Sequence, residues 1–291
     1  LIEKAKSELC IAHAQKIAEE LEIKDFDNFN LKGCCPFHKE DTPSFIFNPK
    51  SNSFYCFGCG KNYDILNHYM EHDGLSYISA VEKLFKEANI EYVFAEKNTR
   101  TKRDYKYPPY ITNPSRVLVI NYMQKRGISL ETLDYCDVQQ SKEGNIVWNF
   151  YDDNDVLTTI KIRKIGIIKN SDPKEYFLPD FDNAPILYNM NKCYPGTILI
   201  ITEGQIDCLS VIESGYKNCV SVPSGTQNLK WIEECYEWLQ QFDKFIIWFD
   251  NDKAGIKSKK EVIARLGSWK CKNVELPLLV EGKSVKDAND V

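Results

Sequence analysis

Two pairs of potential metal ligands in the sequence share one spacing. Cys35-Pro-Phe-His38 and Cys56-Phe-Gly-Cys59 each leave two residues between the ligands, and such a spacer lets a tight turn direct both side chains at one ion. The 17 residues between the pairs contain the alternating polarity of a hairpin. The pattern predicts a small β-sheet domain with one structural zinc ion, held by Cys35, His38, Cys56 and Cys59. Two alternatives stay open: ordinary buried thiols beside a surface histidine, or Cys34 in place of Cys35.

A second histidine pair follows on a predicted helix. His68 and His72 stand four residues apart, which places them on one helix face. No matching pair of ligands accompanies them, and Glu71 and Asp73 should point elsewhere. We therefore interpret this pair as part of a solvated helix face rather than a second metal site.

Aromatic residues are frequent around the predicted zinc site, and such side chains can stack on unpaired bases. A domain this small needs most of them for its core, so we expect at most two to be exposed. The candidates are Phe37, Phe45, Phe47, Phe54, Tyr55 and Phe57.

From Thr197 the sequence alternates between strand and helix patterns. Apolar strands are predicted at Ile198–Ile201, Val220–Val222, Phe245–Phe249 and Val274–Leu276. Alternation of this kind predicts a mainly parallel sheet covered by helices.

Four carboxylates follow two of these strands. Glu203 and Asp207 come after the first, and Asp250 and Asp252 come after the third. The carboxyl ends of parallel strands line one crevice, so the acids should meet there. Oxygen-bound Mg²⁺ or Mn²⁺ would relieve their repulsion and could act on triphosphate oxygens. Acids that merely favour helix N-termini are the alternative for either pair alone.

The remaining elements are predicted from periodicity and punctuation. Helices are expected at Leu9–Leu21, Tyr63–His72, Ser76–Ala88 and Val117–Asp134, and short strands within Asn145–Lys169. Glu96–Ser115 is polar, contains three prolines and has no apolar period, which is typical of a linker. The fold class is therefore α+β and α/β in a multidomain chain.

Composition limits the class of protein. The 291 residues suit two or three domains, and 43% hydrophobic residues can build sizeable cores. No apolar run is long enough to span a membrane. Eleven cysteines without a regular framework indicate a reducing compartment. A net charge of −5 argues against nucleic-acid binding, unless some acids and thiolates hold cations. The first residue, Leu1, and the charged final run suggest a fragment of a longer protein.

Several motifs together resemble a known family. Thr202-Glu-Gly-Gln-Ile-Asp207 and Phe249-Asp-Asn-Asp-Lys-Ala-Gly255 look like the two signatures of the Toprim domain. Cys35-Pro-Phe-His-Lys-Glu-Asp-Thr-Pro-Ser-Phe45 with Phe54-Tyr-Cys-Phe-Gly-Cys-Gly60 resembles the zinc-binding domain of bacterial-type DNA primases. Tyr122-Met-Gln-Lys-Arg-Gly-Ile-Ser129 resembles the start of the primase core, and Lys286-Asp-Ala-Asn-Asp290 resembles a later acidic motif of phage primase-helicases. The matches follow the family's order.

The resemblance implies an organisation into domains. It assigns residues 1–95 to a zinc-binding DNA-reading domain, 96–115 to a linker, 116–194 to the N-terminal part of the polymerase core and 195–291 to the Toprim domain. The small zinc-bound β-sheet domain and the mainly parallel Toprim sheet would then be parts of one enzyme.

It also implies roles for single residues. Glu203 would act as general base or position the base, and Asp207, Asp250 and Asp252 would bind metal, with Asp287 a weaker candidate. Template and triphosphate contacts would come from basic residues in comparable stretches: Arg126, Lys161, Arg163 and Lys174. Lys161 and Arg163 alternate with isoleucines, so we expect both on one exposed strand face, with an ordinary solvated face as the alternative. The segment Asp182-Asn-Ala-Pro185 lacks the basic residue that many relatives carry.

The expected activity is the joining of ribonucleotides into an RNA primer on a single-stranded DNA template. A Toprim nuclease or topoisomerase-like enzyme and a non-catalytic DNA-binding adaptor are the alternatives. Expected partners are template DNA, ribonucleoside triphosphates and a replicative helicase, fused or separate, and the expected place is the cytoplasm of a bacterium or a phage-infected host.

Overall fold

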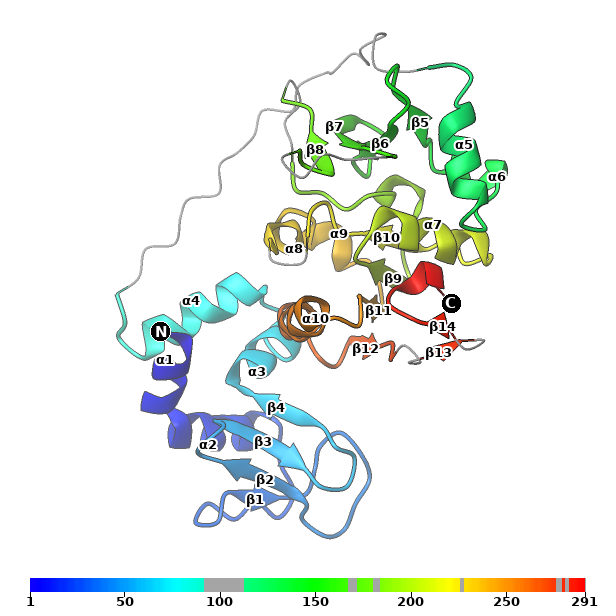
Figure 1. The fold of residues 1–291 in the computed structure, drawn as a ribbon. Coiled ribbons are helices and arrows are strands. Elements are labelled where there is room, and N and C mark those ends of the chain that lie inside the picture. The colour runs from blue at the N-terminus through cyan, green and yellow to red at the C-terminus, as the bar shows by residue number, and fades with distance from the viewer. Residues whose placement is uncertain are drawn as a thin grey trace. The chain divides into compact units, whose positions relative to one another are not determined.

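The computed structural model describes residues 1–91, 113–166, 172–179, 184–225, 228–275, 279–280 and 283–290. The chain forms two compact units, residues 1–98 and 99–291. Figure 1 draws the elements of each unit in chain order. No helix of the described residues is long and apolar enough to cross a membrane.

Unit 1 combines four helices with a four-stranded antiparallel sheet. The strands are β1 (Lys32–Gly33), β2 (Phe45–Asn48), β3 (Ser53–Cys56) and β4 (Asn62–Asp64), hydrogen-bonded in that order. The helices are α1 (Ile2–Glu8), α2 (Cys10–Glu20), α3 (Ile65–Glu71) and α4 (Tyr77–Glu87). α1 was not predicted. Each end of the other three helices lies within two residues of its predicted bound.

Aromatic packing forms the core of unit 1. Phe45 on β2 stacks on Phe54 of β3 with ring centroids 4.5 Å apart. Phe47 is also buried, whereas Tyr55 is 42% exposed and Phe57 is 71% exposed. The prediction that at most two of the six aromatic residues are exposed is confirmed.

The first part of unit 2 is a second antiparallel sheet with two helices. Its strands are β5 (Gln139–Gln140), β6 (Ile146–Tyr151), β7 (Leu157–Arg163) and β8 (Glu175–Phe177), in that order. The helices are α5 (Val117–Gln124) and α6 (Leu130–Tyr135). One helix was predicted over this range, and that is wrong. The chain reverses at Gly127, whose φ is +75°, a conformation that glycine adopts without a steric penalty.

The second part of unit 2 is the predicted parallel sheet. Its order is β10 (Cys219–Ser221), β9 (Ile198–Thr202), β11 (Lys244–Trp248) and β12 (Cys271–Asn273), and every pair is parallel. Helices α7 (Gln205–Glu213), α8 (Lys230–Glu234), α9 (Tyr236–Leu239) and α10 (Lys253–Leu266) connect the strands. A 3-10 turn (Met190–Lys192) precedes the sheet, and a hairpin of β13 (Leu279–Val280) and β14 (Lys283–Ser284) with a 3-10 turn (Ala288–Asp290) follows it.

The last strand lies earlier than predicted. The sequence suggested Val274–Leu276, but β12 covers Cys271–Asn273, and residue 276 lies outside the described residues. β12 is an edge strand with half-buried to exposed residues, so hydrophobicity does not mark it. The predicted strands at 145–169 are β6 and β7, and positions 167–169 of that range lie outside the described residues. Most of the predicted linker, residues 96–112, is also outside the described residues.

The two parts of unit 2 share one hydrophobic core. Buried residues of β6, such as Trp148 and Phe150, belong to the same cluster as Leu199 of β9 and Phe245 of β11. Tyr188 forms an isolated antiparallel bridge with Ser221 of β10. The antiparallel sheet and the parallel sheet therefore pack into one continuous core.

Candidate functional site

The two predicted ligand pairs of unit 1 converge. One ligand atom from each of Cys35, His38, Cys56 and Cys59 lies within 4.8 Å of every other. The Sγ atoms of Cys35 and Cys59 are 3.9 Å apart, and His38 Nδ1 lies 3.8 Å from Cys56 Sγ. Ligand atoms around a tetrahedral zinc ion stand about 3.5–3.8 Å apart, since the bonds are about 2.0–2.3 Å long. The distances given are close to these values, so small side-chain shifts would let the set hold zinc.

Neighbouring groups complete this ligand set. Glu40 Oε2 lies 3.1 Å from His38 Nε2, the ring atom that faces away from the sulfurs, and such a carboxylate orients a metal-bound imidazole. The backbone N–H groups of Gly58 and Cys59 each donate to Cys56 Sγ at 3.3 Å. A Cβ on Gly58 would meet His38 Nε2 at 2.6 Å, so only glycine lets the second turn approach the histidine.

The thiol of Cys56 is tuned toward the ligand form. Burial acts to raise its pKa, but hydrogen bonds from Ser44 and from the turn after Cys56 outweigh burial and lower the pKa to about 7. Cys34, by contrast, contacts Asp25 and lies outside the set. The sulfur that joins the set is therefore that of Cys35.

The four acids of unit 2 lie at the carboxyl edge of the parallel sheet. Thr202, the last residue of β9, pairs with Trp248, the last residue of β11, so Glu203 and Asp250 follow neighbouring strand ends. The backbone N–H of Asp250 donates to Glu203 Oε2 at 3.3 Å. Asp207 lies in the first turn of α7 and is buried. Asp252 caps α10 by accepting from Gly255 N at 2.8 Å.

A third segment joins this acid edge from the C-terminal part of the chain. The N–H of Asn289 donates to Asp207 Oδ1 at 3.3 Å and to Asp287 Oδ1 at 3.1 Å. Lys286 Nζ lies 4.0 Å from Asp250 Oδ2. Asn289 was missed in the sequence, although it lies inside the quoted motif 286–290. Its backbone ties Asp287 to Asp207, which no single-residue pattern reveals.

Burial and like charge raise the pKa values of three of these acids. The pKa of Glu203 is about 7, because of burial first and then the charge of Asp250. The pKa of Asp207 is also about 7, because of burial and then Asp287. Burial, followed by Asp287, raises the pKa of Asp250 to about 6. The three carboxyls influence one another's charge and offer only oxygen donors, the ligands that Mg²⁺ prefers.

The acid edge is looser than the Cys/His set. Within the part of the chain that the structure describes, only two groups place three or more ligand atoms within 4.8 Å of one another, and the acids of unit 2 are in neither. Their electrostatic coupling nevertheless links Glu203, Asp250 and Asp287 across three segments.

The predicted basic residues fall into different environments. Arg126 is exposed; its guanidinium donates to Asn289 Oδ1 at 3.1 Å, beside the acid edge. Lys174 is exposed, and Arg163 is half-buried and paired with Glu175 Oε1 at 2.8 Å.

The expectation of an exposed face is wrong for Lys161, which is 4% exposed. Its Nζ donates to Gln205 Oε1 at 2.9 Å and to Pro223 O at 3.1 Å, and pairs with Glu175 Oε2 at 2.6 Å. The start of α7 and the loop after β10 cover the strand face that the alternation marks as polar.

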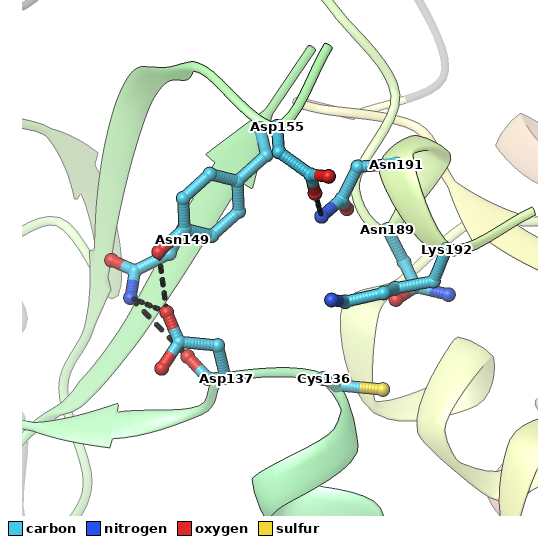
Figure 2. A pocket seen from close by; sticks show the side chains of 8 residues that line it. Cys136, Asp137, Asn149, Asp155, Asn189, Asn191 and Lys192 are labelled. Atoms are coloured by element: carbon cyan, nitrogen blue, oxygen red, sulfur yellow. Dashed lines mark hydrogen bonds between the residues drawn. The ribbon is translucent and has the colours of Figure 1, made fainter. Parts of the chain in front are cut away.

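A polar pocket of about 260 Å³ lies elsewhere in unit 2. Figure 2 shows Asn149 of β6 reaching the Asp137 carboxylate and Asn191 reaching Asp155, with Lys192 extended between the two pairs. No residue that the sequence marked as functional lines this pocket.

Comparison with known proteins finds a family match in each terminal third of the chain. Residues 5–100 match the CHC2 zinc finger family, and residues 200–291 match the Toprim-like family. The DNA primase of Chlamydia pneumoniae is 26% identical over 303 residues, which cover 84% of this chain and 50% of that protein. The DNA primase of Pseudomonas putida is 36% identical over 119 residues, 35% of this chain and 18% of that protein.

Solved structures of primases are also similar. The primase fragment of the bacteriophage T7 primase-helicase matches with 22% identity and a TM-score of 0.48, covering 87% of this chain and 90% of that chain. The zinc-binding and RNA polymerase domains of Aquifex aeolicus primase match with 20% identity and a TM-score of 0.46, covering 95% and 79%. The chain spans about half the length of the first curated relatives it matches. The matched families and curated relatives confirm the resemblance to bacterial-type primases, and the CHC2 match together with the Cys/His set indicates a structural zinc site.

Proposed function

We propose that this chain, which carries a CHC2 zinc finger and a Toprim-like region in the manner of DNA primases, synthesises RNA primers on single-stranded DNA. The observation that carries the proposal is the set of acids at one edge of the parallel sheet, where burial and like charge raise the pKa values of Glu203, Asp207 and Asp250. A site in which three carboxyls have raised pKa values is typical of a functional centre, and it suits a metal-dependent reaction on charged substrates.

The acids have two proposed roles. Asp207 and Asp250, together with Asp252 and Asp287, offer oxygens to divalent cations. Mg²⁺ or Mn²⁺ held there would neutralise triphosphate oxygens and favour the deprotonated form of the attacking hydroxyl. Glu203 follows β9 directly and accepts from the N–H of Asp250, so its other oxygen remains for the proton of that hydroxyl or for placing the group that takes it.

Basic and aromatic residues suit the template and the substrates. Arg126 and Lys174 are exposed, and with the half-buried Arg163 they can contact phosphates of template or triphosphate. Tyr55 and Phe57 lie beside the Cys/His set with ring centroids 5.0 Å apart, and both are exposed enough to stack on unpaired bases. Unit 1 would then choose the initiation site and unit 2 would catalyse.

Partners follow from the same proposal. The substrates are ribonucleoside triphosphates and a single-stranded DNA template. A replicative helicase, fused or separate, would supply that template. A Toprim nuclease is the less favoured alternative, because the curated relatives named above are DNA primases.

A primer assay separates these functions. The full chain is incubated with single-stranded DNA, labelled ribonucleotides and Mg²⁺, and we expect short RNA products that disappear without metal. Asp250→Ala should lose most of this synthesis while its far-UV circular dichroism and zinc content stay at the parental values. Cleavage of the DNA without RNA products would support the nuclease instead. An Asp250→Ala protein that primes at the parental rate would overturn the proposal.

A further inference from the structure

Unit 1 contains a second convergence of metal-ligating side chains, separate from the Cys/His set. One ligand atom from each of four residues lies within 4.8 Å of every other, the same spread that encloses the zinc ligands. We call this group the helical cluster; its members are Glu20, His68, His72 and Asp73. Glu20 ends α2, His68 lies on α3, and His72 and Asp73 directly follow α3.

The contacts inside the helical cluster join imidazoles to carboxylates. His68 Nε2 lies 2.5 Å from Glu20 Oε2, and His72 Nδ1 lies 3.0 Å from Asp73 Oδ1. The two imidazole rings are stacked, with centroids 4.6 Å apart and planes 13° apart. Histidines at positions i and i+4 share a helix face and can bind one ion. Each contact is a hydrogen bond between an imidazole and a carboxylate, and a cation would replace it once the carboxylate moves outward by less than about 1 Å.

Outer groups hold the helical cluster in place. The hydroxyl of buried Tyr63 lies 3.4 Å from His68 Nδ1, the ring atom that faces away from Glu20. Lys83 Nζ contacts Asp73 Oδ2 at 2.7 Å, which leaves Oδ1 toward His72. Partners of this kind orient the rings and carboxylates that bind a metal.

Charge and access also favour a cation. The helical cluster carries two carboxylates, and among the residues that the structure describes Lys83 is the cationic side chain in contact with it. The side chain of His68 is fully buried, whereas those of His72 and Glu20 are 41% and 37% exposed. An ion can therefore enter from solvent and meet a rigid imidazole at the base. Bonds of about 2.0–2.2 Å put ligand atoms about 3.3 Å apart, which the exposed side chains can reach by rotation.

The arrangement points to structure rather than hydrolysis. Glu71 stands between the histidines in sequence, but its carboxylate pairs with Lys61 Nζ at 3.3 Å and is not part of the helical cluster. A zinc site with four protein ligands is closed. We propose that the helical cluster binds a second divalent transition-metal ion, zinc being the expected one, and that this ion fastens the end of α2 to the end of α3. Ligand sets of imidazole and carboxylate suit zinc and its neighbours cobalt and nickel.

A cobalt titration of the full chain tests the proposal. The chain is first loaded with zinc and treated with a chelator until one zinc per chain remains, at the Cys/His set. It is then titrated with Co²⁺ and followed by calorimetry and visible absorbance. We expect one ion per chain with the d–d absorption of nitrogen and oxygen ligands and no thiolate-to-cobalt band, in addition to any ion that the acids of unit 2 hold through oxygen alone. The bound cobalt should raise the thermal midpoint, since it binds the folded state.

Matched variants locate the ion. His72→Ala and Glu20→Gln each remove one exposed ligand and should weaken cobalt binding by about tenfold or more, a loss that even outer partners of a metal cause. Glu71→Gln, on the same helix but outside the helical cluster, should bind as the parent does. All three should keep one zinc per chain, which shows that the Cys/His set and the fold are intact.

Three results would overturn the proposal. They are no nitrogen-ligated ion at millimolar cobalt, equal affinity for that ion in the parent, His72→Ala and Glu20→Gln, and a thiolate-to-cobalt band that reports exchange at the Cys/His set instead. None of these readouts depends on primer synthesis, so the outcome is independent of the proposed enzyme activity.

Discussion

The sulfur of Cys56 illustrates how single residues define the zinc site. It is buried, it accepts two backbone N–H bonds, and its pKa is about 7 because those bonds and Ser44 outweigh burial. A thiol with this pKa loses its proton readily, and the resulting thiolate is the form that binds a metal ion.

Removing a ligand should therefore unfold the zinc domain. Cys56→Ser and Cys59→Ser are expected to lose the structural zinc and, with it, the cooperative folding of about the first 90 residues, because metal binding is folding energy in such domains. Metal analysis and circular dichroism measure both effects. Cys34→Ser is the matched control and should keep its zinc, since Cys34 contacts Asp25 instead. Full zinc in the Cys56→Ser protein would exclude this ligand assignment.

Glu203 permits a test of chemistry apart from binding. Glu203→Gln keeps the size and the acceptor oxygen that meets the Asp250 N–H but cannot take a proton. We expect template and metal binding at parental strength and primer synthesis lowered about 10²–10⁴-fold, the usual contribution of a positioned base. Asp252→Asn at the exposed end of α10 serves for comparison. If Glu203→Gln bound metal poorly but synthesised primers at the parental rate once metal was bound, Glu203 would be a metal ligand instead.

The raised pKa values also predict how stability depends on pH. Glu203, Asp207 and Asp250 have folded-state pKa values of about 7, 7 and 6, above their ordinary values of 4.5, 3.8 and 3.8. The folded state then binds more protons than the unfolded state between pH 4 and 7, so these groups favour folding below about pH 4 and lose that contribution as the pH rises to 7.

Thermal or urea unfolding of the zinc-loaded chain without Mg²⁺, at several pH values, measures this effect. The difference in unfolding free energy between Asp250→Asn and the parent should grow as the pH rises from 4 to 7, with the variant the more stable. Added Mg²⁺ should reduce the difference, because it offsets the same repulsion. A constant difference across this range would contradict the coupling of the acids.

At the scale of elements, Lys161 links β7 to the start of α7. Its ammonium contacts Glu175 of β8, Gln205 of α7 and a carbonyl after β10. Gln205 lies two residues from both Glu203 and Asp207, so Lys161 connects the antiparallel sheet to the acid edge. Burial lowers its pKa, against the opposing charge of Glu175.

Replacing this lysine should destabilise unit 2. Lys161→Met keeps most of the volume but leaves Glu175 with only Arg163 as partner, and breaking a buried ion pair costs about 3–5 kcal/mol. Equilibrium unfolding measures the loss, and adding Glu175→Gln should restore part of it. A Lys161→Met protein of parental stability would disprove the structural role of Lys161.

Arg163→Ala and Lys174→Ala remove charges that are less buried than that of Lys161. We expect each substitution to weaken template binding on all sequences and to flatten its salt dependence by about one unit.

At the scale of the whole molecule, the two compact units should divide recognition from catalysis. Deleting residues 1–95 is expected to abolish initiation at chosen sequences while leaving some extension of a supplied primer by unit 2, because base contacts carry sequence choice and the acids carry chemistry. Mapping the 5′ ends of the products on a mixed-sequence template measures this. If the shortened chain initiates at the same sites as the parent, unit 1 is not the reader.

The sequence by itself determined the features that depend on short spacings. Two residues between ligands fix a turn that can bind zinc, and an acid just past a strand must lie at the sheet edge. The Cys/His set and the edge position of Glu203 and Asp250 follow from these local rules, because covalent geometry limits where near neighbours can point. The parallel order of the central strands followed from their alternation with helices.

Only the tertiary structure decided what distant segments bring to these positions. Glu20 meets His68 across 48 residues, Lys161 meets Gln205 across 44, and Asn289 meets Asp207 across 82. The interpretation of His68 as part of a solvated face, and of Lys161 as exposed, failed for this reason, whereas His72 is exposed as expected. Burial depends on what packs against a residue, and periodicity describes only the element that carries it. The helical cluster exists because α2 ends where α3 ends, and packing, not spacing, brings those ends together.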